Sequence, residues 1–316
     1  MVFKTIVKAA VCLTLTIAIA FAAPIVTPSY KVGVIQVVEH PALDLTRQGI
    51  QDELDQQGFK ENLQWSWDSA QGNPALASQI AQKYIGQEMH VLVAIGTTAA
   101  QAALSASRGS KIPVVFASVT DPKGAKITGN MTGISNFVSP KDQLTAITKI
   151  LPSKKRIGVV YNPGEANSAS LLVQMQSVAK EMGLEIIPAT ASKTSEVSIA
   201  AQGPMGKVAA VFINNDNTAL AAINAIGQIC RDNKLPFFAS DGDLKASGAL
   251  ALIGADQYVI GRQTGRMVAK ILRGEAQATD LAIEYPSRVS IDVNNDVAQT
   301  LKITIPEDLK TIGDKS

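Results

Sequence analysis

The sequence contains little cysteine, histidine and tryptophan, and the two signs of charge are nearly balanced. Its 316 residues include two residues of each of these types, with 29 basic and 27 acidic side chains. Cys12 lies within the first 22 residues, so Cys230 is alone in the rest of the chain and no internal disulfide can form there. The helical context of residues 226–232 indicates a buried rather than a reactive thiol. A small scaffold held by disulfides is therefore excluded.

The charge balance also narrows the range of partners. Residues 1–22 carry two lysines and no acid, so the remainder has 27 side chains of each sign. This balance argues against a nucleic-acid partner and against an anionic membrane surface. Only His90 accompanies His40 in the chain, and the two are distant in sequence, so we predict no zinc site and no cofactor.

Familiar catalytic motifs are missing. The sequence has no G-x-S-x-G elbow, no Walker loop and no G-x-G-x-x-G after a predicted strand. Ser168, with His40 as its base, is the one catalytic pair that we consider. An enzyme is therefore a less favoured hypothesis than a protein that only binds its ligand.

Residues 1–22 have the features of an export signal. Lys4 and Lys8 precede an uncharged run over 9–21, and residues 20–22 form an A-x-A cleavage site, so the mature chain is expected to start at Ala23. The run is short for a membrane span, with a retained anchor as the alternative. Val11 before Cys12 argues against a lipid anchor. Export with a lone cysteine is typical of a bacterial periplasm.

Beyond this segment, strand-like and helical segments alternate. The first half predicts strands at 31–38, 63–68, 91–95 and 112–119, with helices at 42–58, 75–86 and 99–107. The second half predicts helices at 141–150, 169–183 and 219–231, with strands at 156–160, 184–188, 209–213 and 235–239. The tail predicts strands at 248–254, 282–285 and 289–293, with helices at 258–273 and 294–302. This alternation predicts an α/β fold with parallel sheets covered by helices.

The two halves share one pattern at an offset of about 120 residues, which indicates a repeated lobe. Residues 31–58 match 156–183, residues 91–104 match 209–223, and residues 112–121 match 235–241. With the tail, this predicts three crossings, near 132–138, 250–255 and 284–290. The expected division is 1–22 signal peptide, 28–135 plus 252–285 as lobe 1, and 136–251 plus 286–312 as lobe 2.

Two such lobes form a cleft bordered by the carboxyl ends of their strands, where ligands bind in open α/β sheets. The organising loop is residues 161–168, which combine a carboxylate, two carboxamides and a hydroxyl between a strand and a helix. The predicted cleft residues are Glu39, His40, Thr97, Thr98, Thr120 and Asp121 from the first lobe, and Asn162, Glu165, Asn167, Ser168, Asp216, Asn217 and Asp241 from the second.

These side chains suit a zwitterionic ligand. Hydroxyls at a helix N-terminus, as at Thr97 and Thr98, suit a ligand carboxylate. Acids drawn from Glu39, Glu165, Asp216 and Asp241 suit an ammonium group. The alternative interpretation of each residue is a helix or turn cap. A sugar is the other ligand class, but the few aromatic residues do not favour it.

Several of these segments together resemble one family. The segments VEHPALD at 38–44, VTDP at 119–122, NMTGIS at 130–135, YNPGEANS at 161–168 and DNT at 216–218, with Ile305-Pro306, are similar to those of ABC transporter substrate-binding proteins, especially the tryptophan- and tyrosine-type proteins. The resemblance covers essentially the whole mature chain. It implies a periplasmic-binding-protein fold of type I, with two doubly wound parallel-sheet lobes around a ligand cleft.

The resemblance also implies a function without catalysis, in which a small ligand is delivered to an ABC permease and its ATPase. An amino acid, with an aromatic one favoured, is the expected ligand, although the second-lobe sequence NNDN at 214–217 is more polar than such a site would suggest. A freestanding periplasmic ligand sensor is the remaining alternative. Glu165→Ala is expected to abolish tight binding and to leave thermal stability nearly unchanged.

Overall fold

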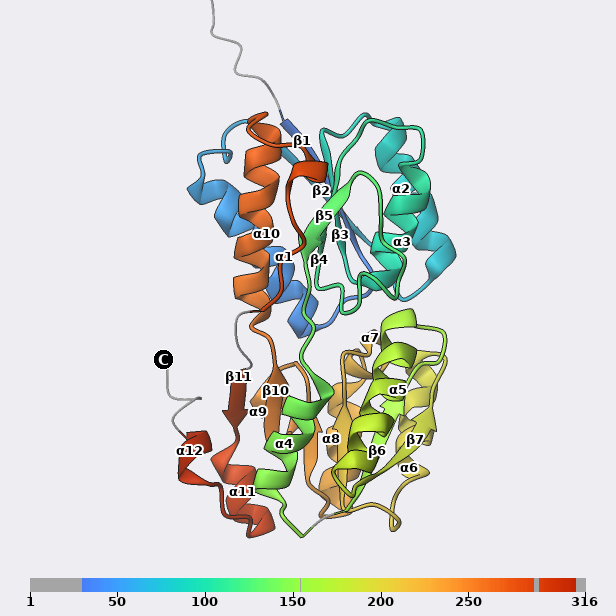
Figure 1. Ribbon diagram of the computed structural model, residues 1–316, viewed down its shortest axis with the longest axis vertical. Coiled ribbons are helices and arrows are strands. Elements are labelled where there is room, and N and C mark those ends of the chain that lie inside the picture. The colour runs from blue at the N-terminus through green and yellow to red at the C-terminus, as the bar shows by residue number, and fades with distance from the viewer. Residues whose placement is uncertain (1–29, 154, 287–289, 311–316) are drawn as a thin grey trace, which may run out of the picture.

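The computed structural model describes residues 30–153, 155–286 and 290–310, so the expected signal peptide lies outside the described residues. Two lobes lie end to end, each built on its own sheet (Figure 1). No helix in the described part of the chain combines the length and the apolar character needed to span a membrane.

The first sheet contains five parallel strands in the order β2-β1-β3-β4-β5. They are β1 (Tyr30–Gln36), β2 (Leu63–Ser69), β3 (Val91–Ile95), β4 (Val114–Ala117) and β5 (Met131–Ile134). Between them lie α1 (Pro41–Gln56), α2 (Pro74–Gly86) and α3 (Thr97–Ala106). Strand β3 is buried along its full length, as expected of a central strand covered on both faces.

The second sheet contains six strands in the order β7-β6-β8-β9-β10-β11, of which only β11 is antiparallel to its neighbour. They are β6 (Arg156–Tyr161), β7 (Glu185–Thr190), β8 (Ala210–Ile213), β9 (Phe237–Ala239), β10 (Ala251–Gly254) and β11 (Ser290–Val293). The helices of this lobe are α4 (Pro140–Ile150), α5 (Ala166–Glu181), η1 (Thr194–Glu196), α6 (Val197–Gln202), α7 (Asn217–Leu220), α8 (Ile223–Asp232), α9 (Leu244–Ser247), α11 (Asn295–Leu301) and α12 (Glu307–Lys310).

The repeat predicted from the sequence is visible in the strand order. The first five strands of each half occur in the same spatial sequence, 2-1-3-4-5, which is a doubly wound order. The predicted fold class, two doubly wound α/β lobes, is therefore confirmed.

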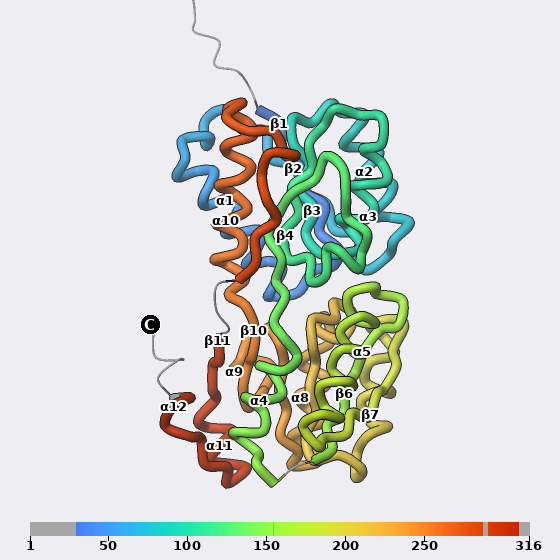
Figure 2. Tube along the Cα trace, viewed as in Figure 1, coloured from blue at the N-terminus to red at the C-terminus, as the bar shows by residue number. Residues whose placement is uncertain are grey.

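Helix α10 (Gln257–Leu272) returns to the first lobe and packs along α1, followed by η2 (Ala278–Asp280) (Figure 2). The chain passes between the sheets after β5, after β10 and again before β11. Strand β10 pairs with β9 and β11, so residues 252–254, which were expected in lobe 1, belong to the second sheet. The small residues of β10 did not indicate which sheet accepts it.

Two predicted elements differ from the structure, and one strand, β5, was not predicted. The helix expected over 219–231 is interrupted at Ala221 and Ala222, which lie between the end of α7 and the start of α8. The strand expected at 282–285 is reduced to one bridge between Ile134 and Glu284. The glycine-rich passage 129–133 supplies most of β5, which pairs with β4. The Thr132 hydroxyl donates to the Leu281 carbonyl oxygen, and the Glu284 N–H donates to the Gly133 carbonyl oxygen.

Helices α1 and α10 approach each other through glycines. A Cβ atom at Gly261 would lie 2.2 Å from the Thr46 carbonyl oxygen, and one at Gly49 would lie 2.4 Å from the Tyr258 carbonyl oxygen. Only hydrogen in place of a side chain permits this backbone spacing. The contact positions the N-terminus of α10, and with it Gln257, at the junction between the lobes.

Candidate ligand-binding site

A cavity lies between the lobes, where the carboxyl ends of both sheets face each other. The first lobe contributes the ends of β1, β4 and β5, and the second lobe contributes the ends of β8 and β9 with α5 and α7. Its lining residues are His40, Ala42, Leu43, Ser118, Thr120, Asn136, Asn167, Asn215, Asn217, Leu220, Asp241 and Gln257. Its volume is approximately 10 Å³, and we call it the interlobe cavity.

Glu165 organises the second-lobe wall without a free oxygen atom. Its Oε1 accepts hydrogen bonds from the Thr218 backbone N–H at 2.9 Å and the Thr218 hydroxyl at 2.7 Å. Its Oε2 accepts from the Asn217 backbone N–H at 3.1 Å, the Asn217 side-chain amide at 2.6 Å and, at 3.5 Å, the Asn167 amide. The carboxylate is buried and holds the start of α7, so Glu165 positions ligand-facing amides instead of pointing at a ligand itself.

This arrangement alters the expectation for Glu165→Ala. A carboxylate that is 7% exposed and accepts five hydrogen bonds stabilises the fold as well as the site. The expectation that thermal stability would be nearly unchanged is therefore replaced by one of clear destabilisation.

Asp216 is the N-cap of α7. Its Oδ1 accepts from the Ala219 N–H at 2.7 Å, and its Oδ2 accepts from the Asn162 N–H and the Ser168 hydroxyl, both at 2.5 Å. The pKa of Asp216 is raised to about 7, first by burial and then by the nearby Glu165 carboxylate, while these hydrogen bonds act in the opposite direction. Asn162, Ser168 and Asp216 therefore join β6, α5 and α7 within the lobe.

His40 and Asp121 make contacts across the cleft. The His40 ring Nε2 lies 3.5 Å from the Asn217 Oδ1, and burial lowers the pKa of His40 to about 4, so the ring is neutral at pH 7. The Ser170 hydroxyl on α5 donates to Asp121 Oδ2 at 2.9 Å, while Asp121 Oδ1 accepts from the Gly124 N–H. Both residues thus join the lobes in the arrangement described here.

The first-lobe wall consists of hydroxyls and amides held by one another. The Thr120 hydroxyl donates to Asn136 Oδ1 at 2.9 Å, which leaves the Asn136 amide nitrogen as a donor. The Ser118 hydroxyl donates to Gln257 Oε1 at 2.6 Å, and Thr46 donates to the same oxygen at 3.0 Å. Gln257 therefore presents its amide nitrogen toward Asp241, whose pKa that hydrogen bond lowers.

Two amide oxygens of the second-lobe wall lack partners. Asn167 Oδ1 and Asn215 Oδ1 are buried and have no hydrogen-bond partner among the described residues. Both residues line the interlobe cavity. Because a buried acceptor without a donor is costly, these oxygens are suited to hydrogen-bond donors on a ligand.

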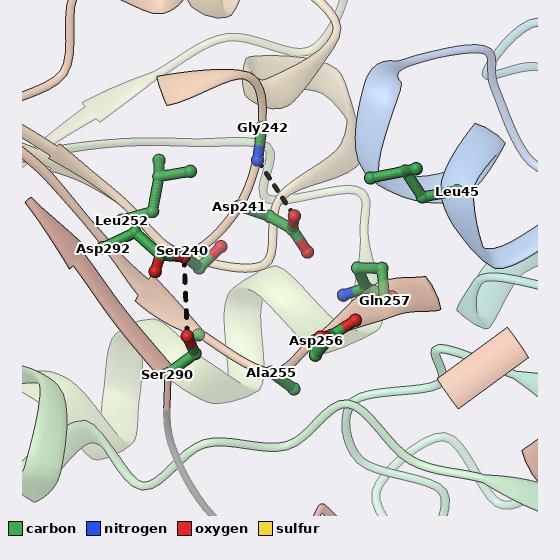
Figure 3. Close-up of a pocket in the computed structure, with 11 residues that line it drawn as sticks. Leu45, Ser240, Asp241, Gly242, Leu252, Ala255, Asp256, Gln257, Ser290 and Asp292 are labelled. Carbon is green, nitrogen blue, oxygen red and sulfur yellow. Dashed lines mark hydrogen bonds between the residues drawn. The ribbon is translucent and has the colours of Figure 1, made fainter. Parts of the chain in front are cut away.

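A second cavity adjoins the first beside β10 and β11, where the chain passes between the lobes, and has a volume of approximately 220 Å³ (Figure 3). We call it the hinge-side cavity. Asp241 and Gln257 line both spaces. Asp241, Asp256 and Asp292 surround the hinge-side cavity, whose lining contains no basic residue among those described. Burial, with a smaller contribution from Asp256 and Asp292, raises the pKa of Asp241 to about 7. This space therefore favours a positively charged group.

The predicted residues thus separate into groups. His40, Thr120, Asn167, Asn217 and Asp241 line the interlobe cavity. Asn162, Glu165, Ser168 and Asp216 support the second-lobe wall, and Asp121 joins the lobes. Glu39 is exposed, and Glu39, Thr97 and Thr98 are not among the lining residues of the interlobe cavity or of the hinge-side cavity. The Thr97 hydroxyl is buried without a partner among the described residues, so its contact with a ligand carboxylate stays a prediction.

Sequence reasoning missed Ser118, Asn136, Asn215 and Gln257. Ser118 has a left-handed φ of 54°, which turns the chain directly after β4, two residues before the predicted Thr120. Asn136 and Gln257 follow the ends of β5 and β10, and β5 was not predicted as a strand. Its recognition would have drawn attention to Asn136 as a strand-end residue.

The raised pKa of Asp216 predicts a pH-dependent stability. Between about pH 4 and pH 7 the folded protein holds a proton on Asp216 that the unfolded chain releases, so stability should fall as pH rises through this range. Asp216→Asn should reduce the slope of unfolding free energy against pH, measured by urea unfolding from pH 4 to 8. Asp243→Asn at the exposed cap of α9 is the control. An unchanged slope in Asp216→Asn would show that Asp216 ionises normally.

The fold and the cavity define a class of protein, a two-lobe binding protein with its site between the lobes. The family model for ABC transporter substrate-binding proteins matches residues 31–316. The chain belongs to the ABC transporter substrate-binding protein family. Within the described residues, no group of histidine, cysteine and acidic side chains is arranged to hold a metal ion.

Relatives of known name support this assignment. A tyrosine-binding protein of Clostridioides difficile strain R20291 is 29% identical over 280 residues, covering 86% of this chain and 80% of that protein. A Streptococcus pneumoniae ABC domain in complex with L-Trp is 29% identical, with a TM-score of 0.85, covering 90% of this chain and 99% of that one. The ligand-free, open structure of a substrate-binding protein with adhesive properties from Clostridium difficile is 30% identical, with a TM-score of 0.65. The match covers 88% of this chain and 97% of that one.

Proposed function

We propose that this protein is the periplasmic binding component of an ABC importer and that it binds an amino acid, with an aromatic one favoured. The observation that carries the proposal is the composition of the interlobe cavity. Unpartnered amide oxygens and Asp241 lie on the second-lobe side, and the amide nitrogen of Asn136 lies on the first-lobe side.

Acceptors on one wall and a donor on the other are complementary to a zwitterion. A ligand ammonium group has three donors, which Asn167 Oδ1, Asn215 Oδ1 and Asp241 can accept. The hinge-side carboxylates add to the attraction, since no cation in their lining offsets them. A ligand carboxylate is suited to the first-lobe donors, together with the buried hydroxyl of Thr97. The tyrosine-binding relative and the L-Trp complex favour an aromatic side chain.

Hinge closure is the proposed binding motion. The chain superposes on the L-Trp complex with a TM-score of 0.85 and on the ligand-free, open structure with 0.65, although both are about equally similar in sequence. The contacts from His40 to Asn217 and from Ser170 to Asp121 cross the cleft. We infer that these contacts break when the lobes separate and that ligand entry and delivery to a permease and ATPase use this motion.

Binding without catalysis is the favoured mode of action. Ser168 and His40, the candidate catalytic pair, each contact a different residue in the structure. The Ser168 hydroxyl donates to Asp216, and the His40 ring contacts Asn217. A nucleophile that donates to a capping carboxylate within the fold lacks the positioned base that acyl transfer requires. An N-terminal signal peptide remains the proposed route to the periplasm.

Calorimetric titration of the twenty common amino acids, with glucose and myo-inositol, tests the proposal. We expect at least one amino acid, tyrosine or tryptophan first, to bind tightly and the two polyols not to bind. Asp241→Asn should weaken the binding about 30-fold or more, because it removes a charged partner of the ammonium group. Asp243→Asn, the same change at an exposed cap, should bind as wild type does. Tight binding of a polyol alone would overturn the amino-acid assignment.

A further inference from the structure

A large hollow lies in the second lobe at the end of the sheet opposite to the interlobe cavity. The end of α8 leads into β9, α9 leads into β10, and β11 leaves toward α11, so the hollow lies beside the amino ends of β9 and β10. Its volume is approximately 770 Å³, and it shares no lining residue with the other two cavities. Its lining is Cys230, Arg231, Lys234, Leu235, Lys245, Gly248, Asn294, Asp296, Val297, Thr300, Leu301 and Lys302. We call it the basic hollow.

Cations dominate the charge of the basic hollow. Arg231, Lys234, Lys245 and Lys302 are exposed along its lining, where Asp296 is the single acid. None of these four side chains forms an ion pair with an acid in the described part of the chain. Since the chain as a whole is nearly neutral, this concentration of unpaired cations attracts an anionic group locally.

Arg231 is held in place before any ligand arrives. Its Nη1 donates to the Ser247 carbonyl oxygen at 3.3 Å, and its Nη2 donates to Gln228 Oε1 at 2.7 Å. Gly248 has a left-handed φ of +67°, and a Cβ atom there would lie 2.0 Å from Arg231 Nη1. The glycine thus leaves room for the guanidinium, whose fixed position reduces the entropy lost on binding.

The floor of the basic hollow is apolar. Cys230 is buried, and Leu235, Val297 and Leu301 are half-buried beside it. The combination of an apolar floor, a few polar groups and this volume is typical of a site for a small molecule. Cations at the rim and apolar side chains below them are complementary to a ligand that has an anionic group and an apolar part.

We propose that the basic hollow binds a small amphipathic anion, in which one carboxylate, sulfonate or phosphate group is attached to an apolar body. The anionic group contacts Arg231 and the lysines, and the apolar body covers Leu235, Val297 and Leu301. The site lies within one lobe, so it is occupied whether the cleft is open or closed and independently of the interlobe ligand.

Fluorescence titration with 1-anilinonaphthalene-8-sulfonate tests the site. We expect saturable binding that the triple variant Lys234→Gln, Lys245→Gln, Lys302→Gln weakens about tenfold or more, because it removes charge-assisted contacts. The matched triple variant Lys180→Gln, Lys193→Gln, Lys207→Gln removes three exposed lysines elsewhere in the same lobe and should bind within about twofold of wild type. Equal affinity of the two triple variants would overturn the proposal.

A second pair of variants changes the charge inside the hollow and leaves the lysines in place. Thr300 is exposed on α11 and lines the hollow, so Thr300→Glu introduces an anion there while Thr300→Gln has nearly the same size and no charge. Thr300→Glu should weaken dye binding about tenfold relative to Thr300→Gln. Octanoate should displace the dye and octanamide should not. Equal behaviour of the two variants, or equal displacement by the two competitors, would contradict an anion site.

Discussion

Glu165→Ala should reduce the free energy of unfolding by about 2–4 kcal/mol and abolish tight ligand binding. The reason is that five donors lose their acceptor together, including the backbone N–H groups of Asn217 and Thr218. Once unanchored, the 215–218 segment no longer holds Asn215 and Asn217 against the interlobe cavity. Urea unfolding and calorimetric titration measure the two effects.

Glu165→Gln is the graded comparison for this prediction. It keeps one acceptor oxygen and loses the charge, so both the stability and the affinity should fall between those of wild type and Glu165→Ala. If Glu165→Ala unfolds and binds as wild type does, the network around the organising loop has no energetic role, and Glu165 only begins helix α5.

The second large effect is expected at the contact between α1 and α10. Gly261→Val must push the helices apart, because even a Cβ atom would lie 2.2 Å from the Thr46 carbonyl oxygen. Overpacking of this kind should reduce the free energy of unfolding by about 3 kcal/mol, or the melting temperature by about 6–12 °C. Ligand affinity should also fall, because Gln257 at the start of α10 lines both cavities of the site.

Gly86→Ala is the matched control, since it adds a Cβ atom at the end of helix α2 with nothing within 4 Å. It should leave stability unchanged or raise it slightly, because alanine favours the helix and restricts the unfolded chain. If Gly261→Val has the same melting temperature as Gly86→Ala, the two helices are free to separate. The close backbone approach then does not hold α10 in the first lobe.

The alternation of strands and helices was sufficient to predict two α/β lobes, because parallel strands buried on both faces occur in the sequence as short apolar runs. The ends of those runs also indicated residues such as His40, Asn217 and Asp241, which do line the interlobe cavity. Strand ends are recognisable from one segment at a time, so this part of the site could be predicted locally.

The roles of the acids could not be predicted in the same way. Glu165 and Asp241 both follow strands and both carry a carboxylate, but Glu165 is occupied by donors from residues 167, 217 and 218 while Asp241 faces two cavities. Distinguishing them requires the packing of β6 beside β8. Gln257 was missed for a similar reason, since its partners Thr46 and Ser118 lie more than a hundred residues away.

The central claim, that the lobes close on an amino acid, can be measured through the distance between labels on the two lobes. Cysteines introduced at the exposed positions Gln79 on α2 and Ser177 on α5 would carry a spin-label pair in the chain from Ala23 onward. The native Cys230 is buried, and burial raises the pKa of its thiol to about 12, so it should escape labelling. A mixture of the twenty common amino acids should shorten the distance, and a mixture of glucose and myo-inositol should leave it unchanged. A distance that stays the same when the amino acids are added, or that shortens only with glucose and myo-inositol, would contradict the account.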